Sequence, residues 1–216
     1  MKIFKVNWLV PLLFLILIVY GAIVYQVYKD ELAVYNPADV NPELVDKSLQ
    51  ELSKNHTVSD FELINQNGKI ITQDDYKDKI YVADFFFSSC PTICPIMTNN
   101  MVKIQEEFLN DKNIMLLSLS VTPNIDSIPR LREYADKNGV IDSKWNVTTG
   151  NKKHIYELAR KSYFAATDEG DGGLQDFIHT SNFILIDKKK RIRGIYNGVD
   201  NKEILRLIND IKILTN

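Results

Sequence analysis

The residues best suited to chemistry are two cysteines four positions apart, Cys90 and Cys94, in the run CPTICP. They are the only cysteines of the chain. Positions i and i+4 of a helix share one face, with Cβ atoms about 5–6 Å apart, so the two sulfurs can form a disulfide or bind one metal ion together. A helix N-terminus stabilises thiolate, which is the nucleophile of disulfide exchange and a ligand of soft metals. A disulfide across so short a loop constrains little of the unfolded chain, which favours a functional pair over a structural staple.

Two sulfurs leave a metal ion short of ligands. Structural zinc takes four, and no second Cys/His pair like that of Cys90 and Cys94 is available for it. Cu(I) is soft and accepts fewer, so two thiolates and one imidazole would make a three-coordinate site. Of the three histidines, His56 and His154 are expected to be ordinary surface residues, whereas His179 directly precedes a predicted strand.

Met97 is a further sulfur near the pair, three residues after Cys94. Thioether sulfur also suits Cu(I). Its spacing with Ile93, Met101 and Ile104 is that of one helix face, so we expect Met97 in the core rather than at a metal.

The elements that position the pair follow from the apolar pattern. A nearly continuous apolar run, Ile80–Phe87, predicts a strand buried on both faces shortly before the cysteines. Asn67-Gly68 between two apolar runs predicts a β-hairpin. The other patterns predict strands over 114–121, 182–187 and 191–196, and helices over 91–109, 128–138, 152–163 and 201–214.

Strands that alternate with helices favour parallel pairing, and the late hairpin adds antiparallel strands to a mixed sheet. The expected fold is α/β and thioredoxin-like, with a central mixed β-sheet flanked by helices. In that arrangement the reactive cysteines follow the first central strand, and the residue before the 182–187 strand faces them. Redox members place a cis-proline there, but this chain has Ile178-His179-Thr180-Ser181. A histidine at this place can complete a Cys-Cys-His metal site.

The N-terminal region is expected to anchor the chain in a membrane. No charged residue lies between Val6 and Tyr28, and about 20 helical residues span a bilayer core. Lys2 and Lys5 precede this run, so the positive-inside rule leaves the N-terminus in the cytoplasm. A cleaved secretory signal is the alternative, but the run is long and no small-residue cleavage site follows it.

These features predict a single-pass protein of a bacterial inner membrane. Residues 1–29 would form the cytoplasmic tip and transmembrane signal anchor, residues 30–56 a tether, and residues 57–216 the thioredoxin-like domain on the periplasmic side. The formal net charge of −2 argues against a nucleic-acid partner. The one cationic run, Lys188–Arg193, falls where a solvated turn between strands is expected.

Asp84 is a carboxylate inside the apolar strand, six residues before Cys90. Burial raises the pKa of an unpaired carboxylate, which suits acid–base chemistry. Thioredoxin keeps a buried aspartate at this offset, where it helps to move a proton to or from the second cysteine. The alternative is an aspartate that only hydrogen-bonds to a neighbouring strand or helix end, and the sequence does not decide between them.

The stretch Phe85–Pro95 (FFFSSCPTICP) resembles the signature of the Sco/SenC proteins. These are membrane-anchored, thioredoxin-like copper proteins that assist assembly of the dinuclear copper centre of cytochrome c oxidase. The run Asp176–Thr180 (DFIHT) adds to the likeness, which covers roughly residues 58–198; weaker support comes from Ser120-Val121-Thr122-Pro123…Asp126 and Trp145…Thr149-Gly150.

The resemblance implies copper ligation by Cys90, Cys94 and His179. Two residues depart from the family. Thr122 stands where the family usually has an acidic residue, and Asp84 where it generally has an apolar or aromatic one.

Two functions are therefore expected, with copper as the metal. The first is a metallochaperone that passes copper by ligand exchange to the copper-accepting subunit of cytochrome c oxidase or a similar client. The alternative is a thiol–disulfide oxidoreductase that reduces the acceptor's cysteines, with Cys90 and Cys94 as the redox pair and Asp84 as acid or base. A third possible function is that of a redox or copper sensor, but no sequence feature indicates it.

Overall fold

The computed structural model describes residues 9–29, 32–45, 47–51, 53–166, 173 and 176–215. The chain forms two compact units, Met1–Leu32 and Ala33–Asn216.

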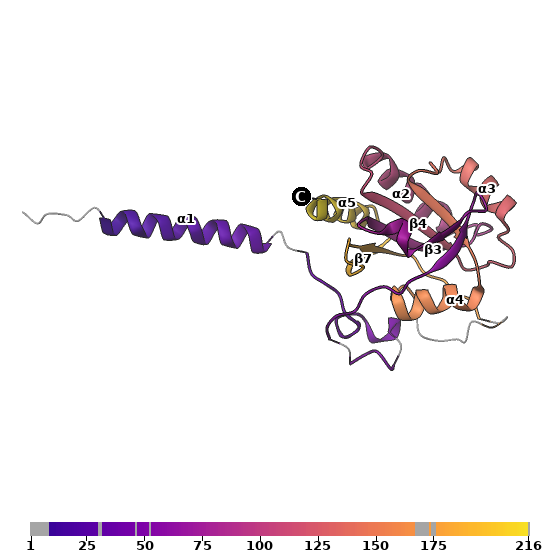
Figure 1. Ribbon diagram of the computed structural model, residues 1–216, viewed down its shortest axis with the longest axis horizontal. Coiled ribbons are helices and arrows are strands. Elements are labelled where there is room, and N and C mark those ends of the chain that lie inside the picture. Colours follow the sequence, from indigo (N-terminus) through magenta and orange to yellow (C-terminus); the bar gives the residue numbers. More distant parts are fainter. Residues whose placement is uncertain are drawn as a thin grey trace, which may run out of the picture. The chain divides into compact units, whose positions relative to one another are not determined.

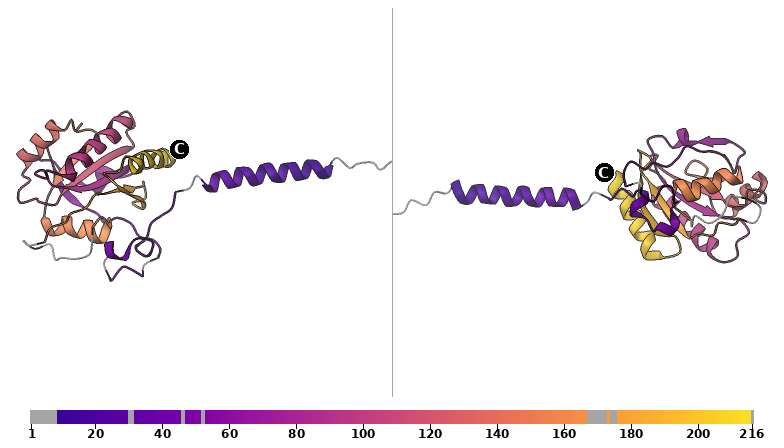
Figure 2. Two further views of the ribbon diagram at one scale, coloured as in Figure 1. Left: turned by 180° about the vertical axis from the view of Figure 1, so that it is seen from behind. Right: turned by 90° about the horizontal axis from the view of Figure 1, so that it is seen from below.

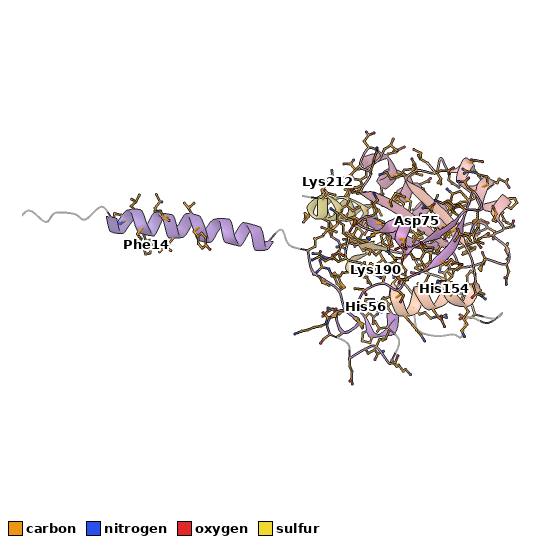
Figure 3. All side chains as sticks on the ribbon, in the orientation of Figure 1. Phe14, His56, Asp75, His154, Lys190 and Lys212 are labelled. Atoms are coloured by element: carbon orange, nitrogen blue, oxygen red, sulfur yellow. The ribbon has the colours of Figure 1, made fainter. Side chains whose placement is uncertain are left out.

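The first unit contains α1, Leu9–Lys29, built from the apolar N-terminal run. Its described side chains, such as that of Phe14, are exposed (Figure 3). Within the described part of the chain, no helix has both the length and the apolar character that a membrane crossing requires. The charges expected to flank the span, at Lys2 and Lys5, lie outside the described residues.

The second unit is built on a mixed sheet of seven strands in the order β2-β1-β5-β4-β3-β6-β7. The central strands β5, β4 and β3 run parallel, because the chain crosses over through helices between them. All other neighbouring strands pair antiparallel. The strands are β1 Glu62–Asn65, β2 Ile70–Thr72, β3 Ile80–Phe86, β4 Ile114–Ser120, β5 Trp145–Thr149, β6 Asn182–Ile186 and β7 Ile192–Asn197.

Helices cover both faces of this sheet (Figures 1 and 2). On one face lie α2 (Ile93–Glu107), α3 (Ile128–Lys137) and α5 (Asn201–Thr215). On the other lies α4 (Lys152–Glu157), which continues as a single π-helical turn, η4 (Leu158–Ser162). Alternate side chains of β3 reach the two layers. Phe86 contacts Tyr134 of α3 with ring centroids 5.1 Å apart, whereas Phe85 contacts Tyr163, directly after η4, at 5.9 Å.

Most of the predicted elements are present, with ends that differ by a few residues. The Asn67-Gly68 hairpin forms as β1–β2, and Gly68 takes the left-handed conformation that such a turn requires (φ 73°). The predicted helix over 152–163 is α-helical only to Glu157. β5 was not predicted as a strand. The fold is the mixed, helix-flanked sheet expected from the sequence.

The described residues between Ala33 and β1 belong to the second unit and pack on the rest of it. Tyr35 forms an antiparallel bridge with Ile192 of β7. Val45 is fully buried, and Val40 is also buried. The segment that the sequence suggested as a tether therefore contributes core side chains. Its short 3₁₀ helices are η1 (Pro37–Asp39) and η2 (Pro42–Leu44), and a third, η3 (Gln73–Tyr76), follows β2.

Candidate functional site

The cysteine loop, residues 87–92 between β3 and α2, lies at the edge of the sheet where the parallel strands end. β3 and β4 run in register, with Phe86 opposite Ser120, and the Val121 N–H donates to the Phe86 carbonyl over 2.8 Å. The loop after β3 and the loop after β4 therefore begin side by side. Loops at the carboxyl ends of parallel strands are a frequent place for functional sites in α/β folds.

Cys90 precedes the helix rather than starting it. Its N–H donates to the Phe87 carbonyl over 3.2 Å, which closes a tight turn. Thr92 has non-helical angles (φ −115°, ψ −86°) and α2 begins at Ile93, so Cys94 is the second helical residue. The expectation that both cysteines share a helix face is therefore wrong in detail, but the turn still brings the two thiols within hydrogen-bonding reach. Both are free thiols and buried.

The two thiols differ strongly in acidity. Burial opposes ionisation of Cys90, but the N–H groups of Cys94 and Thr92 point to its sulfur and lower the pKa to about 7. Burial raises the pKa of Cys94 to about 12, helped by the neighbouring Cys90 and the charge of Asp84 and opposed by the Phe87 N–H. At neutral pH, Cys90 is therefore the available nucleophile and Cys94 remains protonated.

Asp84 lies in β3, and its residue is only 3% exposed. It accepts a short hydrogen bond from Ser118 of β4, and Ser118 accepts one from the Trp145 indole N–H over 2.9 Å. Burial raises the pKa of Asp84 to about 7, although the Ser118 hydrogen bond lowers it. Asp84 therefore has both expected features: a hydrogen bond to a neighbouring strand, and the raised pKa that suits an acid or base.

A second buried carboxylate, Asp126, was not assigned a role from the sequence. It is fully buried and accepts hydrogen bonds from the Ser88 N–H (3.3 Å) and from the hydroxyls of Ser88 (2.5 Å), Ser120 (2.5 Å) and Thr122 (2.9 Å). Arg130 approaches to 3.9 Å. Asp126 therefore joins the cysteine loop to the loop after β4. The hydroxyls of Ser120 and Thr122 close to Asp126 in the sequence were the available signal, but they do not indicate the contact with Ser88.

The chain that leads to His179 lies beside the residues that follow β3. β6 pairs antiparallel with β3, and the pairing ends where Ala83 lies opposite Ile184. Phe177, two residues before His179, packs on Phe87 with ring centroids 5.2 Å apart. The His179 side chain is exposed. Among the residues that the structure describes, no three His, Cys, Asp or Glu side chains lie close enough together to hold a metal ion. The thiols of Cys90 and Cys94 are close to each other. The His179 side chain does not form a three-ligand group with them.

The other candidate ligands lie elsewhere. Met97 is fully buried, as its helical spacing predicted. His154 lies on α4, and His56 precedes β1 (Figure 3). His56 is half-buried, stacks on Phe164 with ring centroids 4.4 Å apart, and its Nε2 is 2.8 Å from the Ser162 carbonyl oxygen. Packing around His56 is thus tighter than the sequence suggested.

Comparison with known proteins agrees with this architecture. Residues 49–215 match the SCO1/SenC family model. The SCO1 protein homolog of Bacillus subtilis (strain 168) is 32% identical over 160 residues, which cover 73% of this chain and 82% of that protein.

Solved structures show the same likeness. A SCO1/SenC family lipoprotein from Bacillus anthracis is 32% identical, with a TM-score of 0.66 over 75% of this chain and 96% of that one. BsSco, a member of the Sco family of cytochrome c oxidase assembly proteins for which a disulfide switch is described, is also 32% identical, with a TM-score of 0.64 over 75% and 95%. Copper-bound structures of more distant Sco proteins share the fold. The chain belongs to the SCO1/SenC family.

Proposed function

We propose that this protein binds copper through Cys90, Cys94 and His179 and transfers it to a copper-accepting subunit of cytochrome c oxidase. The observation that supports the proposal is the nearness of two adjacent thiols to the segment that carries His179, whose Phe177 packs on Phe87. Membership of a family that includes cytochrome c oxidase assembly proteins supports the client.

The donor set suits copper as cargo. Two sulfurs and one imidazole match the preference of Cu(I) for soft ligands and low coordination numbers. The lowered pKa of Cys90 provides a thiolate at neutral pH. The His179 side chain is exposed, so a client's ligands can reach the copper ion on the imidazole side and replace the imidazole during transfer.

A second function, reduction of a client disulfide, is favoured by the unequal acidity of the two thiols. The Cys90 thiolate attacks one client sulfur, a mixed disulfide forms, and the other client sulfur leaves as thiolate. Cys94 then gives its proton to the Asp84 carboxylate and attacks the Cys90 sulfur, which releases the second client thiolate. The client gains two electrons, and the protein is left with a Cys90–Cys94 disulfide.

The proposed setting is the outer side of a bacterial inner membrane. Residues 1–29 would be the single-pass signal anchor, and the compact unit that begins at Ala33 would be the thioredoxin-like domain. The charge-free run Val6–Tyr28 supports the anchor. The Bacillus anthracis relative is a lipoprotein, which supports membrane attachment of the domain but through a different kind of anchor. An oxidising compartment would also allow the cysteine pair to cycle.

Two substitutions separate the functions. His179→Ala should lower copper affinity at least about tenfold, as loss of one of three ligands requires, while disulfide formation between the cysteines remains intact. His154→Ala is the matched control and should leave copper affinity unchanged. If His179→Ala bound copper as tightly as wild type, the three-ligand site would be refuted. Asp84→Asn should slow thiol exchange more than it weakens copper binding, and equal exchange rates would refute the acid–base role.

A further inference from the structure

A buried ion pair holds the chain three residues before His179. The carboxylate of Asp176 and the guanidinium of Arg160 form two parallel hydrogen bonds of 2.6 and 2.7 Å. The two side chains are only 6% and 7% exposed. Buried bidentate pairs of this kind fix geometry in addition to balancing charge.

Two further residues of the same helix hold the backbone of Asp176. Lys152 donates to the Asp176 carbonyl over 2.7 Å, and the Tyr156 hydroxyl lies 3.2 Å from the same oxygen. Lys152, Tyr156 and Arg160 follow one another at intervals of four residues along α4 and η4, so they share a helix face. The Tyr156 ring lies between the two cations, 4.9 Å from Lys152 Nζ and 5.3 Å from Arg160 Cζ. We call these three residues the α4 clamp.

The chain on both sides of His179 is also attached. Phe177 packs edge-to-face on Phe87 of the cysteine loop, with ring centroids 5.2 Å apart. After His179, the Thr180 hydroxyl donates to the Ala165 carbonyl over 2.5 Å. The exposed imidazole is therefore carried by a fixed stretch of backbone.

We propose that the α4 clamp is a positioning device for His179, and that Asp176 is the residue through which it acts. This inference rests on the proposed copper site. A ligand held in place before the metal arrives loses less conformational freedom on binding, so its backbone support contributes to metal affinity. Groups that orient a metal ligand cost 10- to 100-fold in affinity when replaced.

A double-mutant cycle in the full-length protein in detergent tests the proposal. Cu(I) affinity is measured by competition with a chromogenic chelator, for wild type, Asp176→Asn, His179→Ala and the double variant. Asp176→Asn should weaken binding about tenfold in the wild-type background and less than about twofold in the His179→Ala background, because a positioning residue has nothing left to position once the imidazole is gone. The thiolate-to-copper(II) absorption band should shift in the same direction in Asp176→Asn and His179→Ala.

The matched control is Asp187→Asn. Asp187 follows the opposite end of β6, pairs with Arg193 at 3.0 Å, and both side chains are 7% exposed. Its replacement should lower stability but leave copper affinity unchanged. If Asp176→Asn fails to fold, Arg160→Lys replaces it in the same cycle, because lysine keeps the charge and removes the bidentate geometry.

Each result has one meaning. Weaker binding by Asp176→Asn only when His179 is present supports the proposal. Equal weakening in both backgrounds, or none in either, overturns it. If the single variant His179→Ala binds Cu(I) as tightly as wild type, the proposed copper site itself is refuted.

Discussion

Asp84→Asn tests the buried carboxylate of β3 through the pH dependence of folding. Burial raises the pKa of Asp84 from 3.8 to about 7. At about 1.4 kcal/mol per pH unit, this difference corresponds to about 4 kcal/mol between the folded and unfolded states. Because the pKa is higher in the folded protein, the stability that Asp84 contributes is present below pH 4 and is lost as the pH rises through about 7. Asparagine does not titrate, so the variant lacks this loss.

The assay is urea unfolding of the chain from Ala33 onward, at intervals between pH 4 and pH 8. Relative to Asp84→Asn, wild type should lose about 4 kcal/mol of unfolding free energy across this range. Ser118→Ala adds a second test. The Ser118 hydrogen bond lowers the pKa of Asp84, so its removal should extend the loss of stability to higher pH. Parallel pH profiles for wild type and Asp84→Asn would show that the carboxylate ionises as freely in the folded protein as in the unfolded one.

Three further predictions concern the site and its surroundings. In a Cys94→Ser variant, alkylation of Cys90 should rise with pH through about 7, whereas Cys94 in a Cys90→Ser variant should remain unreactive at pH 8; equal rates would contradict the assigned acidities. Asp126→Ala leaves the donors of Ser88 and its neighbours without an acceptor and should cost about 3 kcal/mol in urea unfolding, so a loss below about 1 kcal/mol would show that the network is not needed. Met97→Leu should cost less than about 1.5 kcal/mol and leave copper stoichiometry unchanged, and loss of copper would place this thioether at the metal.

Local patterns were sufficient for the elements that bury apolar side chains. The run Ile80–Phe87 predicted β3 because a strand covered on both faces is apolar throughout. β5 was not predicted as a strand because several of its buried side chains are polar, so no apolar pattern marks it. Asn146 donates to the Tyr76 hydroxyl (2.9 Å), and the Thr148 hydroxyl donates to the Ser118 carbonyl (2.8 Å). A buried polar strand depends on partners from distant elements, which periodicity does not reveal.

The site shows the same division. The spacing of Cys90 and Cys94 predicted that their thiols meet, since that contact is local. The unequal acidity of the thiols could not be predicted, because it depends on the direction of individual N–H groups and on burial in the folded chain. The contact of Asp126 with Ser88 spans 38 residues, and the pairing of Arg160 with Asp176 requires a helix and a loop to meet. Such contacts follow from tertiary packing and not from any local signal.

The bridge between Tyr35 and Ile192 has a consequence for the exposed edge of the sheet. β7 is the last strand of the sheet, so its outer edge would offer unpaired backbone groups to another chain. Tyr35 occupies part of that edge through its N–H bond to the Ile192 carbonyl (2.9 Å), and Arg193 ties down the neighbouring Ala33 carbonyl (2.9 Å). A chain shortened to begin at residue 57 would uncover the edge and gain a route to strand-by-strand aggregation. By covering this edge, Ala33 and Tyr35 make it less accessible for pairing with a strand of another chain.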